Sequence, residues 1–268
     1  MSDRKAEPTK SEGVSAAPDH EVVSHDAWIA RRTALLAREK EFTRLRDELS
    51  AERRALPWEP VTREYVFDGP RGRETLAQLF EGRSQLVVYH AMFDPETAGP
   101  RTPYTANAAC KACSFWMDNF NGIVTHLNHR DVTIIASSRA PVDKLAAYQK
   151  RMGWIFKWVS VGDGDFNRDY GVTMTAEEVA SRQGTYNYRT GSPPVPELPG
   201  ISVFYKDPAG HVFHTYSTYA RGLDMLNVAY HYLDIVPRGR QEDPATGGAM
   251  GWLKRHDEYG DTGAAACH

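Results

Sequence analysis

Two cysteines, Cys110 and Cys113, lie two residues apart and carry the strongest chemical signal in the sequence. Two thiols at this spacing can close a disulfide across the first turn of a helix. Amide donors at a helix N-terminus lower the pKa of a thiol because they stabilise the thiolate. The neighbouring Lys111 would stabilise it further. We predict that Cys110 attacks a substrate disulfide and that Cys113 resolves the mixed disulfide.

Two other interpretations of this pair remain open. Zinc needs four ligands, and because the chain has no second Cys-x-x-Cys motif, histidine would have to complete the site. His90, in the strand expected before the cysteines, is the nearest histidine by topology, and a thiolate beside a histidine could also bind copper. Alternatively, the two thiols only pack, because free cysteine is a good small hydrophobic residue. We therefore expect no resident cofactor, with copper or zinc on Cys110, Cys113 and His90 as the alternative.

Three further side chains are candidates for a substrate pocket. Trp116 follows Cys113 by three residues and either packs in the core or lines a groove. His214 lies in a stretch that is both polar and aromatic, a composition typical of buried hydrogen-bond networks as well as of pockets. Arg221, in the same stretch, could bind a small acid. For a single histidine, including His90, a structural hydrogen-bonding role is the more common one.

The elements that must position the cysteines read, in order, as strand, helix, strand, helix, irregular segment and hairpin. Apolar, β-branched and aromatic runs predict strands at 85–93 and 131–137, and helical spacing predicts helices from 113 and from 141. A hairpin is expected over 201–217. Helices of this length let the first two strands run parallel. This is the order of the thioredoxin-like α/β fold, a central mixed sheet with flanking helices.

Composition and periodicity divide the chain into four parts. Residues 1–24 are expected to be a disordered leader, since they contain almost no aromatic residues. Residues 25–60 contain a long amphipathic helix that ends before Pro57 and packs on the domain or on a second subunit, giving a possible homodimer. Residues 61–260 form the thioredoxin-like domain, and 261–268 a flexible tail that carries the exposed thiol of Cys267.

The overall composition gives no reason to expect nucleic acid or an anionic membrane as a partner. The chain has 268 residues, 41% hydrophobic residues and a formal charge of −3, so its net charge favours neither nucleic acid nor an anionic membrane. It has no run of eighteen apolar residues and no apolar signal-peptide centre near its start. We expect a cytoplasmic protein whose partner is a protein or small-molecule thiol or disulfide. A third hypothesis is a non-enzymatic redox sensor or interaction module whose oxidation changes dimerisation through the first helix.

Several long motifs carry a resemblance to a known family. They are CKACSFWMDNFNG at 110–122, RMGW at 151–154, HTYSTYARGLDML at 214–226 and YLDIVPRGRQED at 232–243. From about residue 25 to 260 the chain resembles a bacterial family of thioredoxin-like proteins catalogued as a domain of unknown function. The resemblance implies a thioredoxin-like fold and assigns the redox pair to Cys110 and Cys113, but it supplies no substrate. The 94–109 segment is longer than in that family and could gate the site.

Overall fold

The computed structural model describes residues 20–242 and 250–260 of the chain. The α-helices are α1 (His25–Ala55), α2 (Lys111–Met117), α3 (Phe120–His129), α4 (Val142–Arg151), α5 (Phe166–Asp169), α6 (Ala176–Ser181) and α7 (Val228–Leu233). The strands are β1 (Glu59–Pro60), β2 (Val66–Gly69), β3 (Gly72–Thr75), β4 (Gln85–His90), β5 (Val132–Ser138), β6 (Lys157–Ser160), β7 (Gly184–Tyr186), β8 (Arg189–Gly191), β9 (Gly200–Lys206) and β10 (Val212–Tyr219). Short 3-10 helices are η1 (Gln78–Phe80), η2 (Ala220–Leu226) and η5 (His256–Glu258).

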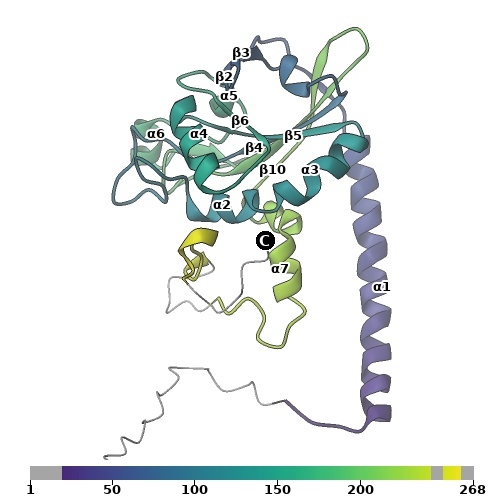
Figure 1. The fold of residues 1–268 in the computed structure, drawn as a ribbon. Coiled ribbons are helices and arrows are strands. Elements are labelled where there is room, and N and C mark those ends of the chain that lie inside the picture. The colour runs from purple at the N-terminus through teal and green to yellow at the C-terminus, as the bar shows by residue number, and fades with distance from the viewer. Residues whose placement is uncertain (1–19, 243–249, 261–268) are drawn as a thin grey trace, which may run out of the picture.

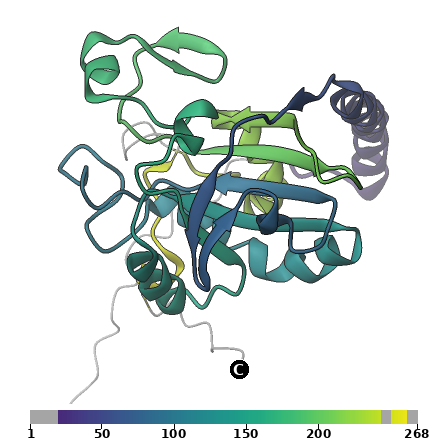
Figure 2. The ribbon, with the colours of Figure 1, turned by 90° about the horizontal axis from the view of Figure 1, so that it is seen from above.

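A mixed eight-stranded sheet forms the centre of the molecule, in the order β1-β10-β9-β4-β5-β6-β2-β3. Strands β4, β5 and β6 are parallel neighbours, while β9 pairs antiparallel with β4 and continues into the antiparallel β9–β10 hairpin. Figure 2 shows this sheet from above, with the small β7–β8 hairpin standing beside it. The predicted thioredoxin-like α/β fold is confirmed.

The side chains of β4 alternate between two cores. Leu86 and Val88 belong to one buried cluster, whereas Val87 and Tyr89 contact the cluster that contains both cysteines. This alternation follows from the two-residue period of a strand. Helices α2 and α3 lie along one face of the sheet, with α7 beyond them (Figure 1). The residues that follow β4 lie beside the first turn of α2, because Met92 hydrogen-bonds to Cys110 and Cys113.

Three local differences from the sequence-based expectation have physical reasons. The single helix expected from residue 113 is two helices, α2 and α3, because the side chain of Asn119 bonds the carbonyl oxygens of Phe115 and Trp116 at the break. Strand β6 lies in the segment expected to be irregular, since four residues are too few to show a period. Strand β3 pairs with β2 at the edge of the sheet, although residues 72–75 contain no apolar run that would predict a strand.

The helical extension stands apart from the body of the protein. Helix α1 has 31 residues and none of them is buried; it extends from the domain as a single rod (Figure 1). Ser24 caps the first turn of α1. The helix ends at Ala55, before Pro57, as predicted. The expected packing of this helix on its own domain is not seen.

Some predictions concern residues that lie outside the described ones. These are the leader up to residue 19 and the tail from 261, with its Cys267. Among the helices of the described ranges, none is both long and apolar enough to cross a membrane.

Candidate redox site

Cys110 and Cys113 are held together against the end of β4. Cys110 is the N-cap residue of α2, and both cysteines are free thiols that are only 1% exposed. The backbone of Met92 binds both: its carbonyl oxygen accepts from the amide of Cys110 (3.0 Å), and its amide donates to Sγ of Cys113 (3.3 Å). A single residue, two positions beyond the end of β4, thus holds both cysteines.

The pKa values of the two thiols are shifted in opposite directions. A hydrogen bond from Cys113, supported by the amides of Cys113 and Ala112 and by the charge of Arg255, lowers the pKa of Cys110 although burial opposes this. Burial, together with the hydrogen bond to Cys110, raises the pKa of Cys113 well above its ordinary value. Cys110 is therefore the more readily ionised thiol, and Cys113 remains protonated.

Three hydroxyl groups surround the pair. Tyr89 forms a hydrogen bond with Cys113, and burial followed by the charge of Cys113 raises the pKa of Tyr89 far above its usual value. Ser114 donates to the carbonyl oxygen of Cys110 (3.0 Å) and lies 2.9 Å from the hydroxyl of Tyr148. These hydroxyl groups were not predicted from the sequence, although the alternation of side chains along β4 places Tyr89 on the face that α2 covers.

A segment from the C-terminal part of the chain covers the pair. We call residues 250–259 the C-terminal cover; in Figure 1 it lies beneath α2. Arg255 donates from Nη2 to the carbonyl oxygen of Ala109 (2.8 Å), and Lys111 donates from Nζ to Gly251 (3.4 Å). The ring of Trp252 packs edge-on against Phe115 at 5.6 Å. The cover thus closes the solvent side of the first turn of α2.

Polar contacts anchor the cover to the domain. Arg151 pairs with Asp257 (2.6 Å) and Glu258 (2.9 Å), and His256 contacts Asp118 (2.7 Å). Lys111 was predicted to stabilise the thiolate of Cys110. In the structure its ammonium group instead donates to the carbonyl oxygen of Gly251 in the cover. The cation whose charge acts on Cys110 is Arg255, 145 positions away in sequence, which no local pattern could identify.

His90 faces away from the cysteines, although the topology predicted it as their nearest histidine. It follows Tyr89 in β4, so its ring points to the opposite face of the sheet. There Nδ1 lies 2.9 Å from Oδ1 of Asn167, and Nε2 lies 2.9 Å from Oγ of Ser202. Burial lowers the pKa of His90 to about 4. His90 is therefore a neutral, structural hydrogen-bonding residue.

The other sequence-predicted side chains also have partners outside the redox pair. Trp116 is buried and donates from Nε1 to the carbonyl oxygen of Leu223 (2.9 Å), so it packs in the core. His214 contacts Ser217 (2.7 Å), as a network residue would. Arg221 is an exposed side chain that pairs with Asp224 (2.9 Å).

The copper or zinc alternative finds no ligand set in the described residues. Residues 20–242 and 250–260 contain no group of three or more His, Cys, Asp or Glu side chains arranged to hold a metal ion. His90, the third ligand of that hypothesis, lies on the other face of the sheet from Cys113.

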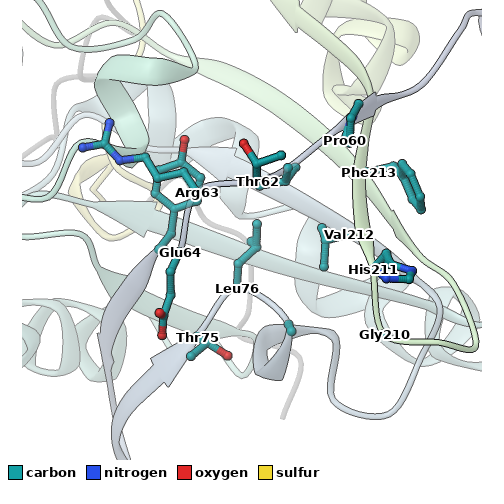
Figure 3. Close-up of a pocket in the computed structure, with 13 residues that line it drawn as sticks. Pro60, Thr62, Arg63, Glu64, Thr75, Leu76, Gly210, His211, Val212 and Phe213 are labelled. Carbon is teal, nitrogen blue, oxygen red and sulfur yellow. The ribbon is translucent and has the colours of Figure 1, made fainter.

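An open cleft of about 670 Å³ lies elsewhere, between the segment from Pro60 to Tyr65, the end of β3 and the β9–β10 turn. Figure 3 shows its labelled lining, which includes Leu76, Val212 and Phe213 and contains no cysteine. This cleft is separate from the redox pair.

Comparisons with known proteins give one family and several distant structures. The model of a family described as "Bacterial protein of unknown function (DUF899)" matches residues 17–259. No curated protein matches the chain.

Peroxiredoxins are among the solved structures that match. A mutant of Xanthomonas campestris peroxiredoxin Q is 17% identical, with 65% of this chain and 98% of that chain covered and a TM-score of 0.40. Peroxidoxin BcpB from Mycobacterium tuberculosis is 14% identical, with 63% and 92% covered and a TM-score of 0.40. A yeast mitochondrial 1-Cys peroxiredoxin is 18% identical, with 67% and 78% covered and a TM-score of 0.35. Similarities this low do not assign a reaction to the chain.

Proposed function

The chain belongs to the DUF899 family of bacterial proteins of unknown function, and we propose that it is a thiol–disulfide oxidoreductase that acts through Cys110 and Cys113. The observation that carries this proposal is the geometry of the pair: Cys110 is the N-cap residue of α2, and the backbone of Met92 hydrogen-bonds to both cysteines at that turn. The directions of the two pKa shifts, down for Cys110 and up for Cys113, agree with the roles proposed for them. Exchange requires one thiolate that attacks and a second thiol that stays protonated until the mixed disulfide has formed.

Reduction of a substrate disulfide proceeds in two exchange steps. The Cys110 thiolate attacks one substrate sulfur, so that a mixed disulfide forms and the other sulfur leaves as a thiolate, which takes a proton from solvent. Cys113 then loses its proton and attacks Sγ of Cys110, which closes the Cys110–Cys113 disulfide and releases the second substrate thiol. Two electrons pass from the protein to the substrate, and the reverse sequence oxidises a substrate dithiol.

Access to Cys110 requires movement of the C-terminal cover. A sulfur that is buried cannot meet a substrate disulfide, and the contacts of Arg255 and Lys111 close the side of α2 that faces solvent. The polar anchors of the cover are partly exposed, and such ion pairs contribute little to stability. We therefore assign to the cover the opening step that precedes disulfide exchange with a protein or small-molecule substrate.

The proposal is tested by trapping the mixed disulfide. All variants carry Cys267→Ser, so that only the pair can react. The Cys113→Ser variant is expected to accumulate a mixed disulfide with a small aromatic disulfide such as 5,5′-dithiobis(2-nitrobenzoate) and to hold it. The Cys110→Ser variant should form far less adduct, and the protein with both cysteines should release the adduct and close its own disulfide. Equal trapping by the two single variants would overturn the assigned roles.

A further inference from the structure

We propose that a second site, a small cleft lined by four tyrosines, binds an organic cation with a quaternary or methylated ammonium head group. The tyrosine cleft has a volume of about 250 Å³ and includes Tyr170, Tyr186, Tyr188, Tyr219, Glu59 and His214 in its lining. It lies between the β7–β8 hairpin, β10 and β1, and neither Cys110 nor Cys113 lines it. Its volume is below the range of about 300–1,000 Å³ that is typical of drug-sized ligands. It suits a small head group.

Three of the four rings of the cleft are held in place by their own hydroxyl groups. Tyr219 donates to the carbonyl oxygen of Tyr170 (2.9 Å), Tyr186 to that of Pro199 (2.6 Å), and Tyr188 to that of Ser217 (3.1 Å). Because the backbone accepts from each of these three hydroxyl groups, these three rings have fixed orientations before any ligand arrives. Preorganisation of this kind lowers the entropy cost of binding.

Ring contacts join three of the four tyrosines into one aromatic cluster. Tyr186 and Tyr188 both pack edge-on against Tyr219, with ring centroids 5.5 Å and 5.6 Å apart. Burial raises the pKa values of Tyr170, Tyr186 and Tyr219 above their ordinary value, so these phenols are neutral. A neutral aromatic face carries a negative quadrupole that attracts a cation.

A strained turn presents the outermost ring. Asn187 and Tyr188 connect β7 to β8, and both have left-handed backbones, with φ of 53° and 61°. Two-residue hairpin turns of this kind favour Asn-Gly, because a bulky side chain is disfavoured at positive φ. Tyr188 nevertheless occupies the glycine position, and it is 73% exposed, so burial of its ring does not offset the strain. A ring held in this way is placed to contact a ligand.

The charges around the tyrosine cleft favour a cation. No lysine or arginine lines it, and its two carboxylates are Glu59 and Asp169. Arg63 neutralises Asp169 at 2.9 Å, whereas the Glu59 side chain is 77% exposed and contacts His214 at 3.3 Å. A carboxylate beside neutral aromatic faces is the combination that recognises organic ammonium ions. An anion would find no lysine or arginine in this lining.

Binding is tested by calorimetric titration of the full chain with choline, at constant ionic strength kept with sodium chloride. The neutral isostere 3,3-dimethyl-1-butanol has the same shape without the charge. We expect choline to bind and the neutral isostere to bind at least ten-fold more weakly. Tetramethylammonium serves as a second probe and should bind as well, because the head group alone makes the proposed contacts. Absence of binding by both cations at millimolar concentration overturns the proposal, as does equal binding of the neutral isostere.

Variants separate recognition from folding. Tyr188→Gly removes the ring and relieves the strained turn, so we expect unchanged or higher thermal stability together with at least a ten-fold loss of choline affinity. Glu59→Gln should weaken binding several-fold. Tyr232→Ala removes a tyrosine of similar exposure on α7 and should leave the affinity unchanged. Unchanged affinity in a folded Tyr188→Gly protein would contradict the site. These measurements do not involve the redox pair, so they stand or fall independently of the oxidoreductase proposal.

Discussion

Arg255 donates a 2.8 Å hydrogen bond from Nη2 to the carbonyl oxygen of Ala109, the residue directly before Cys110. Arg255 therefore acts on the attacking thiol in two ways. Its hydrogen bond holds the C-terminal cover beside Cys110, and its positive charge helps to lower the pKa of Cys110. The cover therefore both shields the sulfur from solvent and favours its ionised form. These two effects can be separated by experiment.

The electrostatic effect is tested with Arg255→Gln. Loss of the positive charge should raise the pKa of Cys110, so that its alkylation by iodoacetamide reaches half of its plateau rate at a higher pH. The pH of this midpoint is the readout, because a looser cover would change the plateau rate instead. Lys254→Gln, an exposed neighbour of the same charge, is the control. A midpoint that shifts equally in both variants would mean that Arg255 has no specific effect.

The shielding effect is tested by releasing the anchor of the cover. Arg151→Ala removes the contacts with Asp257 and Glu258, and we expect the plateau rate of Cys110 alkylation to rise about ten-fold or more. Arg168→Ala, which breaks a comparable exposed ion pair with Glu178, is the matched control and should leave the rate unchanged. If thiol reactivity stays the same in Arg151→Ala, the cover does not control access.

A buried carboxyl group should make stability depend on pH. Burial raises the pKa of Glu197 from 4.5 to about 8, and the side chain is 3% exposed. Below pH 4.5 the group is protonated in both the folded and the unfolded chain. As the pH rises towards 8, only the unfolded chain loses the proton, so the free energy of unfolding falls. At about 1.4 kcal/mol per pKa unit, the loss is at most about 5 kcal/mol.

The measurement for Glu197 is urea denaturation at pH 5 and pH 8. Glu197→Gln should remove most of the decrease in the free energy of unfolding between these two values and make the protein more stable at pH 8. Glu177→Gln, at an exposed position, should show the same decrease as the unaltered protein. An equal pH dependence in all three proteins would show that Glu197 is ionised in the folded state.

Helix α1 leads to a prediction about assembly. Trp28, Leu35, Phe42 and Leu49 recur every seven residues along it, and all four are at least 40% exposed. A stripe of large apolar side chains left exposed on one side of a helix favours pairing with a second helix, and Leu45 extends this stripe. We propose that two copies of the chain pair in parallel through this stripe.

The charges beside the stripe of α1 set the direction of the pair. On the coiled-coil register, Glu41 of one copy faces Arg46 of the other when the helices run parallel. Phe42→Glu should convert the dimer to a monomer in light scattering. Ile235→Glu, at an exposed apolar position elsewhere, should not. A monomeric unaltered protein contradicts the pairing. A dimer that forms or dissociates when the cysteines are reduced would favour the redox-sensor hypothesis.

How far the sequence predicts the site is clear from two adjacent residues of β4. The composition of 85–93 identified the strand, and the Cys-x-x-Cys motif identified the pair at the start of a helix. Topology alone then placed His90 near the cysteines, but the period of the strand puts Tyr89 on that face and His90 on the other. The order of the strands predicts at which end of the sheet a residue lies. The face to which its side chain points depends on the two-residue period of the strand.

The contacts that cover the pair were not predictable from the sequence. Arg255 reaches Ala109 across 146 positions, and the intervening sequence has no motif that couples them. The fold was easier to infer, because the parallel β4–β5 pair and the β9–β10 hairpin follow from local composition and connection length. Long-range contacts made by irregular segments depend on tertiary packing. Strand β6 was missed for a different reason, because its four residues are too few to show a period.

The central claim is that Cys110 and Cys113 cycle between a dithiol and a disulfide. It is tested most directly by equilibrating the Cys267→Ser protein in a series of glutathione buffers, then measuring free thiols and the mass of the peptide that spans both cysteines. The same sample is analysed for metals. We predict a metal-free protein in which both thiols disappear together in one two-electron transition, with a loss of two hydrogens. A pair that stays reduced across the series, or a stoichiometric metal that blocks thiol titration, would contradict the account.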